Sequence, residues 1–395
     1  MIKKKVSETL ANEVLEAIRE VVGPGHAPLH EPSFNGNERE YLQECLDSTY
    51  VSSVGKFVDK FEKELANFTG AQHVVSVVNG TSALQIALQL AGVKPLDEVL
   101  IPALTFIATA NAVSYCNAIP HFVDSEEATL GIDTFKLRKY LSEHSSQSGG
   151  KCINNETGRI IRAIVPMHTF GHPSDMDGLL TIAKDFNLAL VEDAAESLGS
   201  YYKGKHTGTF GLMGTLSFNG NKIITTGGGG AILTDDADLA RRAKHLTTTA
   251  KLPHPWEFRH DEIGYNMRMP NLNAAVGCAQ LESIDSKLSI KRELHLRYQK
   301  AFANIRGIKL IAEPTNCHSN YWLQTLLLDK EFADQRNLIL DMTNKAEIIT
   351  RPAWEIIKSL TPYMNSPSAE LDSTSSLAGR IINIPSSPSL IGRNE

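Results

Sequence analysis

The chain has 395 residues, of which 42% are hydrophobic and 21% charged, with a formal net charge of -6. That composition is typical of a globular protein long enough for two domains. The acidic balance argues against nucleic acid as a partner, and no apolar run is long enough for membrane insertion. Five widely spaced cysteines without a Cys-x-x-Cys motif favour reduced thiols in a cytoplasmic protein, not a disulfide or metal framework.

The first part of the chain is predicted to be helical. Residues 6–22 mix Glu and Arg with apolar residues, which indicates an amphipathic helix and not the core of a signal peptide. Helical periodicity returns at 37–47 and 57–68. We assign residues 1–55 to an N-terminal helical arm and loop.

From residue 74 onward, short apolar runs alternate with helical patterns. The strand-like runs lie at 74–78, 98–101, 120–123, 160–167, 188–192, 215–218 and 231–234. This alternation predicts an α/β domain over residues 56–285, with a mostly parallel sheet between helices. Ligands bind such sheets at the carboxyl ends of the strands.

A long helical pattern at 272–305 leads out of this domain. The strand candidate at 321–328 and the helix at 334–345 predict a smaller C-terminal α+β domain over residues 286–395. The polar segment 145–157 is predicted to be a surface loop.

Lys222 follows one strand-like run and precedes four glycines, residues 227–230. A lysine there can reach into a cleft and form an imine, so a nearby phosphate cradle and carboxylate would indicate pyridoxal 5'-phosphate (PLP). Taken alone, an ordinary loop lysine explains the same pattern. The glycines match neither a Walker sequence nor Gly-x-Gly-x-x-Gly, which argues against a nucleotide-phosphate loop.

A phosphate-binding turn is predicted where the first strand of the sheet meets a helix. Gly80, Thr81 and Ser82 would present backbone N–H groups and hydroxyls at the helix N-terminus, although simple capping is the alternative. Gly80 permits close backbone approach. Ser217, five residues before the lysine, can add a hydroxyl.

Two acids end the strand at 188–192. Because side chains alternate along a strand, at most one of Glu192 and Asp193 faces the site, and we favour Asp193 as the partner of a pyridinium N–H. The alternatives are helix capping and a structural ion pair. Phe106 can stack on a flat ring, although a core role is as plausible, and His168 fits a structural role better than a substrate contact.

Together these residues resemble the DegT-type sugar-nucleotide aminotransferases, which are PLP enzymes of fold type I. The resemblance covers nearly the whole chain and is carried by residues 79–82, 105–106, 192–196, 217–222 and 264–269. Within the family, residues 28–32, 47–55 and 381–388 are most similar to the legionaminic-acid-pathway branch. Residues 51–55 and 220–227 are shared with GDP-perosamine synthases, which are the alternative.

The resemblance implies a role for each matching residue. Lys222 forms the imine with PLP and shuttles the proton, Asp193 pairs with the pyridine nitrogen, and Glu196 lies near the ring's 3'-hydroxyl. Phe106 packs on the ring, while Thr81, Ser82 and Ser217 hold the phosphate. Asn266 reaches the phosphate of the partner subunit in a homodimer with a shared active site, and Arg268 lies near the substrate with His168.

The activity implied is amino transfer from L-glutamate to C4 of a nucleotide-linked 4-keto-6-deoxy sugar. The legionaminic branch implies a UDP-linked, N-acetylated sugar for surface polysaccharide. Lys222 is retained, which favours transamination over the dehydratase-type relatives, whereas Gly228 stands where many relatives have an acidic residue. A non-catalytic PLP or sugar-nucleotide binder with a regulatory role is the alternative from another class.

Overall fold

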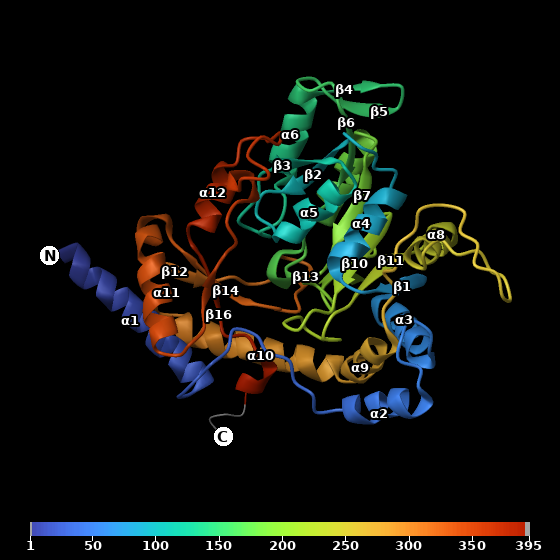
Figure 1. Ribbon diagram of the computed structural model, residues 1–395. Helices are drawn as coiled ribbons and strands as arrows, with labels where there is room; N and C mark the ends of the chain where they lie inside the picture. The colour runs from blue at the N-terminus through green and yellow to red at the C-terminus, as the bar shows by residue number, and fades with distance from the viewer. Residues whose placement is uncertain (1, 392–395) are drawn as a thin grey trace.

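A nine-stranded, mostly parallel sheet organises the larger part of the computed structural model, which describes residues 2–391 (Figure 1). Its main row of strands runs β1-β11-β10-β7-β6-β2-β3. The bounds are β1 His73–Val77, β2 Glu98–Pro102, β3 Ile119–Val123, β6 Ile160–Ile164, β7 Ala189–Asp193, β10 Met213–Ser217 and β11 Gly230–Thr234. Within this row β11 is antiparallel to both of its neighbours. The predicted α/β class is confirmed.

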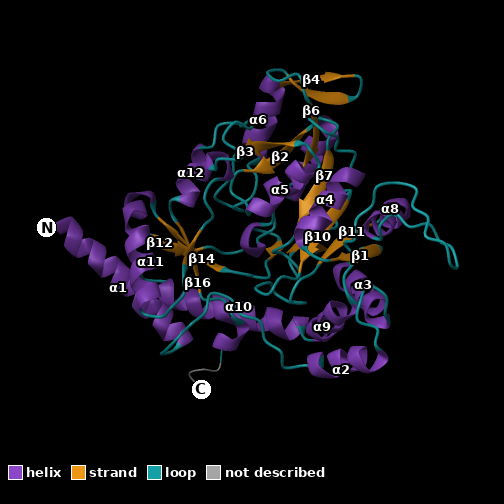
Figure 2. Cartoon of the chain, in the orientation of Figure 1, coloured by secondary structure: helices purple, strands orange, loops and turns teal. Residues whose placement is uncertain are grey.

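Helices cover both faces of the sheet because strand side chains alternate between two apolar clusters (Figure 2). Val99 and Ile101 of β2 pack in the cluster that holds α4 and α5, whereas Leu100 packs in the cluster of α6 and α7. The helices of this part are α3 Lys56–Thr69, α4 Gly80–Leu90, α5 Ile107–Tyr115, α6 Thr134–His144, α7 Met176–Asp185, α8 Ala237–Thr247 and α9 Asn271–Glu282. Because β2, β3, β6, β7 and β10 run parallel, the loops at their carboxyl ends lie at one edge of the sheet.

The prediction of a surface loop at 145–157 was wrong. The segment forms a hairpin of β4 (Ser145–Ser148) and β5 (Lys151–Asn154), and β5 pairs with β6. Cys152 is fully buried, and the Asn154 side chain donates to buried Glu98 at 2.8 Å. Too few side chains of this hairpin are buried to leave an apolar alternation in the sequence.

A smaller antiparallel sheet of four strands lies beside the large one, in the order β12-β14-β16-β15. Its strands are β12 Ile308–Leu310, β14 Gln324–Leu328, β15 Arg351–Pro352 and β16 Ile381–Ile384. Helices α1 (Ile2–Val22), α10 (Ile284–Phe302) and α11 (Arg336–Lys345) share one apolar cluster with it. The first helix therefore packs on the C-terminal part of the chain, whereas the domain boundaries near 55 and 285 stay predictions.

The remaining elements are short connections or lie at the margins. They are α2 Glu38–Ser48, β8 Tyr201–Tyr202, β9 Lys205–His206, β13 Cys317–His318, α12 Asp372–Ala378 and the 3-10 turns Thr169–Gly171, Lys330–Gln335, Ile357–Ser359 and Pro388–Leu390. Among residues 2–391, none of the helices has the length and apolarity needed to cross a bilayer.

Candidate active site

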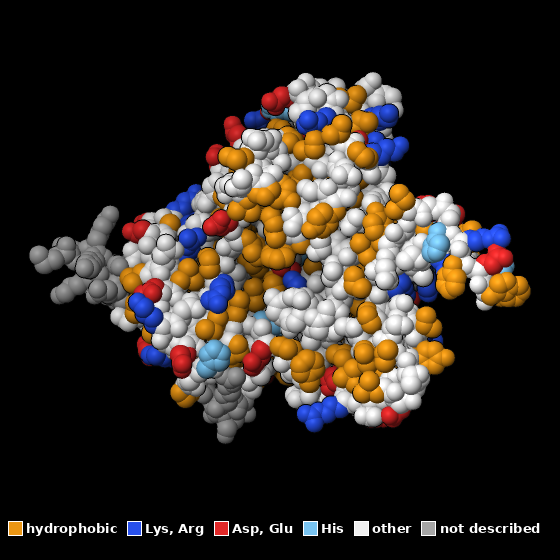
Figure 3. All heavy atoms as spheres, viewed as in Figure 1, with side chains coloured by type: hydrophobic (Ala, Val, Ile, Leu, Met, Phe, Trp, Pro, Cys, Tyr) orange, Lys and Arg blue, Asp and Glu red, His pale blue; other side chains and the backbone are white. Residues whose placement is uncertain are grey.

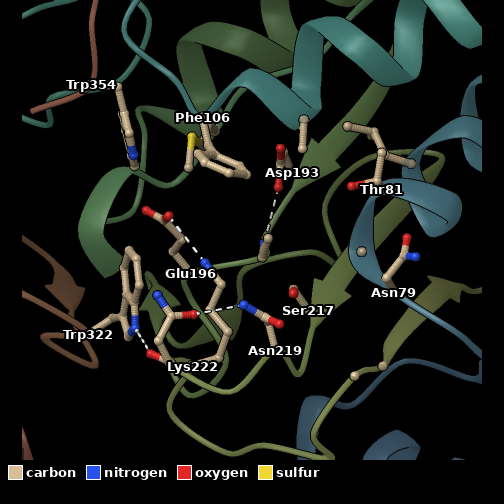
Figure 4. Close-up of a pocket in the computed structure, with 18 residues that line it drawn as sticks. Asn79, Thr81, Phe106, Asp193, Glu196, Ser217, Asn219, Lys222, Trp322 and Trp354 are labelled. Carbon is tan, nitrogen blue, oxygen red and sulfur yellow. Dashed lines mark hydrogen bonds and ion pairs between the residues drawn. The ribbon is translucent and has the colours of Figure 1, made fainter. Parts of the chain in front are cut away.

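A cavity of about 380 Å³ lies at the carboxyl ends of β7 and β10 (Figure 4). Its walls come from both parts of the chain, since Trp322 and Trp354, in loops next to β14 and β15 of the C-terminal part, face residues of the large sheet. The predicted site residues that line it are Gly80, Thr81, Phe106, Asp193, Glu196, Ser217 and Lys222. The fold thus brings most of the predicted set together.

One end of the cavity is the N-terminus of α4. The Asn79 side chain accepts from the Ser82 N–H at 2.7 Å, and the Ala83 N–H donates to the Asn79 carbonyl at 3.1 Å. These bonds leave the N–H groups of Gly80 and Thr81 at the open end of the helix, beside Ser217. A Cβ at Gly80 would lie 2.9 Å from the Ser217 Cβ, so glycine is needed for this close approach. Helix dipole, N–H groups and hydroxyls together suit a phosphate.

The middle of the cavity holds Asp193, the last residue of β7. Thr109 donates to its Oδ2 at 2.7 Å and the Ala195 N–H to its Oδ1 at 3.2 Å. Burial raises the pKa of this carboxyl above its ordinary value. Neither hydrogen-bond partner carries a positive charge, so a cation placed against this carboxylate would meet an unneutralised buried charge.

Glu192, the neighbouring residue, points to the opposite face of β7. It accepts from the N–H groups of Gly208, Phe210 and Gly211 and pairs with His168 at 3.1 Å. Burial opposes ionisation, but these donors outweigh it and hold the pKa of Glu192 below its ordinary value. The Ser174 N–H donates to His168 Nδ1, so Nε2 carries the hydrogen that faces Glu192. His168 is fully buried with both ring nitrogens engaged, and it does not line the cavity.

Lys222 lies at the other end of the cavity from the α4 N-terminus (Figure 4). Its Nζ is 3.3 Å from Glu196 Oε1 and 4.0 Å from the centre of the Trp322 ring. The Phe170 N–H donates to the second carboxyl oxygen of Glu196 at 2.9 Å. Burial raises the pKa of Glu196 to about 7, although Lys222 lowers it in part. Such a carboxyl can give or take a proton near neutrality.

Aromatic side chains form the wall beside the lysine. Trp354 packs on Phe106 and Phe170, with ring centres 6.3 and 4.9 Å apart. Phe106 is 48% exposed, which leaves its ring available to a flat ligand.

Besides His168, three predicted residues lie outside this cavity lining. Ser82 is buried, and its N–H is occupied by the Asn79 cap. Asn266 is exposed on the loop before α9. The Arg268 guanidinium binds Glu62 at 2.6 Å and the Ser76 carbonyl at 2.8 Å and is only 5% exposed, so its charge is already used within the chain.

Several functional residues escaped the sequence reasoning. Thr109, which orients Asp193, sits one helical turn after Phe106, so a polar residue on the inner face of that helix was an available signal. Trp322 lies 100 residues after Lys222 and in the other sheet layer, and no local pattern links the two. Trp354, by contrast, left a signal in the sequence, because Arg351 and Trp354 together are typical of a loop that contacts a diphosphate and a base.

These residues fit PLP. The open helix end suits its phosphate, Asp193 lacks the cation that a protonated ring nitrogen would provide, and Lys222 stands where an imine can form. The fold and the site together define a PLP-dependent enzyme of fold type I.

Comparison with known proteins places the chain more narrowly. Residues 32–394 match the sequence profile of the DegT/DnrJ/EryC1/StrS aminotransferase family, so the chain belongs to this family. It is 38% identical to a GDP-perosamine synthase from Escherichia coli O157:H7 over 367 residues, which cover 92% of this chain and 94% of that protein. It is 36% identical to a GDP-perosamine synthase from Caulobacter vibrioides over 356 residues, or 90% and 91% of the two chains.

A solved structure of a putative sugar aminotransferase from Streptococcus pneumoniae, in its PLP form, superimposes with a TM-score of 0.82 at 24% identity over 92% of this chain and 94% of the other. The fold-type-I expectation is thereby confirmed. The protein is a PLP-dependent sugar aminotransferase.

Proposed function

We propose that the protein transfers the amino group of L-glutamate to C4 of a nucleotide-linked 4-keto-6-deoxy sugar. The observation that carries the proposal is one cavity with Lys222 and Glu196 at one end, Asp193 in the middle and an open helix N-terminus at the other. That order matches the carbonyl, ring and phosphate of PLP.

Each residue has a task in this reaction. Bound PLP supplies a carbonyl that takes up the amine and a ring that withdraws electrons from the substrate's α-carbon. Asp193 would keep a proton on the ring nitrogen. The Lys222 Nζ would carry the proton away from the α-carbon of the donor, and Glu196, 3.3 Å from that amine, would be the hydrogen-bond partner of the ring's 3'-hydroxyl. Phe106 would pack on one face of the ring.

Two nucleotides, UDP and GDP, are candidates for the carrier of the sugar substrate. Sequence resemblance at 28–32, 47–55 and 381–388 supports a UDP-linked, N-acetylated sugar of the legionaminic type. The two relatives named GDP-perosamine synthase support a GDP-linked sugar instead. Both classes contain a 4-keto-6-deoxy hexose, so the chemistry proposed for Lys222 is the same.

We also propose that the site is shared in a homodimer in the cytoplasm. A single chain exposes Trp256, Phe258 and Ile263 by 77%, 79% and 88% on the projecting loop between α8 and α9 (Figures 1 and 3). Large exposed apolar side chains of this kind mark contact surfaces. Asn266 lies on the same loop, three residues after Ile263, and is exposed, as a residue that contacts a partner subunit would be in the single chain. Free cysteines agree with a reducing compartment.

The test begins with the absorption spectrum of the purified protein. L-glutamate should convert the visible band of lysine-bound PLP to the near-ultraviolet band of the aminated cofactor. UDP-linked and GDP-linked 4-keto-6-deoxy sugars, added separately, should then restore the first band to different extents and so identify the nucleotide. Lys222→Ala should bind PLP without covalent attachment and show no conversion. A wild-type band that responds to no amino donor would overturn the proposal.

A further inference from the structure

Trp322 makes more hydrogen bonds than a residue that only fills space requires. Its Nε1–H donates to the Asn221 carbonyl at 2.7 Å, its N–H donates to Asn320 Oδ1 at 2.8 Å, and its carbonyl accepts from Lys291 at 2.9 Å. The side chain is 4% exposed. All three polar groups of this residue therefore have partners, which fix the indole ring in place.

Asn320, two residues before Trp322, also holds the segment of Glu196, whose carboxylate is the other group in contact with the Lys222 amine. Asn320 Nδ2 donates to the carbonyls of Glu196 and Leu198, both at 2.9 Å. Asn320 thus ties the Trp322 backbone to the chain that carries the Glu196 carboxylate, and Trp322 ties itself to the residue before Lys222. The ring and the carboxylate keep one fixed separation around the lysine amine.

Two strained residues support this arrangement. Phe170 and Tyr321 are buried aromatic residues with φ of 55° and 47°, the left-handed region that bulky side chains rarely adopt. The Phe170 N–H donates to Glu196, and its carbonyl accepts from Leu323 at 3.4 Å. Strain of this kind persists where surrounding contacts hold a functional group in position.

We propose that Trp322 is a positioning residue for Lys222: the face of its indole holds the amine at Glu196, so that the segment leading into β14 fixes where the lysine side chain ends. The inference rests on the proposed function of this site. An ammonium group over an indole face is stabilised, most strongly when it is removed from water. Lys222 is mostly buried, with 14% of its side chain exposed, so the effect should be measurable.

The test uses the full chain freed of PLP and an amine-acetylating reagent at neutral pH. The acetylation rate of Lys222 is read from its peptide by mass spectrometry in wild type, W322F, W322L and W354L. Trp322→Leu should be acetylated roughly three- to tenfold faster, because the indole face no longer holds the amine against Glu196 and shields it from the reagent. Trp322→Phe keeps an aromatic face and should stay within about twofold of wild type.

Trp354→Leu is the matched control, since it opens the same cavity wall without removing a ring that contacts the amine. An equal rise in W354L and W322L, or an unchanged rate in W322L, would overturn the inference. If W322L does not fold, judged by its thermal transition, Trp322→Met replaces it with a flexible apolar side chain. PLP should protect wild-type Lys222. Failure of that protection would count against the proposed function alone, because the comparison among PLP-free variants still decides the role of Trp322.

Discussion

The two faces of strand β7 end in carboxylates with opposite surroundings. Glu192 has three backbone N–H donors and a histidine, whereas Asp193 has one hydroxyl and one N–H donor. The pKa is accordingly lowered for Glu192 and raised by burial for Asp193. The protein's own donors satisfy the Glu192 carboxylate. The Asp193 carboxylate has no cationic hydrogen-bond partner, which a bound cation would supply. A buried carboxylate with few hydrogen-bond donors therefore marks the reactive face of β7, and a buried carboxylate with several donors marks the structural face.

Asp193→Asn should produce the largest change in catalysis. The amide keeps the shape of the side chain but cannot hold a proton on the ring nitrogen, so kcat should fall by roughly 10²- to 10⁴-fold. Thermal stability should stay close to wild type, because a raised pKa means that the ionised carboxylate is not favoured by the fold. Steady-state kinetics with glutamate and calorimetry check both parts. Near-normal turnover would contradict the role of Asp193.

Glu192→Gln should show the reverse pattern. An amide cannot accept from four donors with its –NH₂ group facing them, so the free energy of unfolding should fall by about 3 kcal/mol or more. Turnover per folded molecule at low temperature should change little. Denaturant unfolding and active-site titration separate the two effects, and a selective loss of kcat would place Glu192 on the reactive face instead.

Titration of Glu196 should make the stability of the folded protein depend on pH. Its pKa of about 7 lies above the ~4.3 of an unfolded glutamate, so the folded protein binds this proton more tightly than the unfolded chain does. The resulting stability is complete below ~4.3 and is lost as the pH rises through about 7.

In PLP-free protein, Glu196→Gln should therefore remove a decline of about 3 kcal/mol in the free energy of unfolding between about pH 5 and about pH 8. The measurement is denaturant unfolding of both proteins across that range. Parallel curves for wild type and variant would show that Glu196 does not titrate there.

Thr109→Val tests how the reactive face is tuned. The variant keeps the volume but removes the hydroxyl that donates to Asp193 Oδ2. A hydrogen bond to a charged group contributes about 1.5–3 kcal/mol, so kcat/KM should fall roughly ten- to a hundredfold. Thr105→Val is the neighbouring control, since its hydroxyl contacts Thr109 and Met167 but not Asp193. Equal losses in the two variants would point to packing and not to the bond.

The smallest expected effect separates two residues of the phosphate turn. Thr81 lines the cavity and Ser82 does not, although the sequence assigns both to the phosphate. Thr81→Ala should weaken PLP binding about three- to tenfold, and Ser82→Ala by less than about twofold. Fluorescence titration with PLP gives both dissociation constants. A larger loss for Ser82→Ala would restore the sequence assignment.

Local patterns predicted the parts of the site that lie at strand ends. Alternation along β7 assigned Asp193 to the site, and the turn before α4 was visible as a Gly-Thr-Ser helix start. Tertiary packing decided the rest. The Arg268 charge is used by Glu62, which lies 206 residues away, and Trp322 reaches Lys222 from the segment before β14 of the smaller sheet. The β4–β5 hairpin was missed because its strands bury only Cys152 and Asn154, and Asn154 is held by a polar bond to Glu98.

The division of the cavity between two sheets has a consequence for protein engineering. The large sheet supplies the lysine, the acids and the helix end, whereas Trp322 and Trp354 arrive with the last quarter of the chain. Chimeras that exchange this last quarter between family members would keep Lys222, the two acids and the α4 N-terminus and replace the tryptophan wall of the cavity. Recombination at that junction is therefore a direct route to new sugar preferences, provided that Asn320 and the Asn221 carbonyl keep their bonds across the seam.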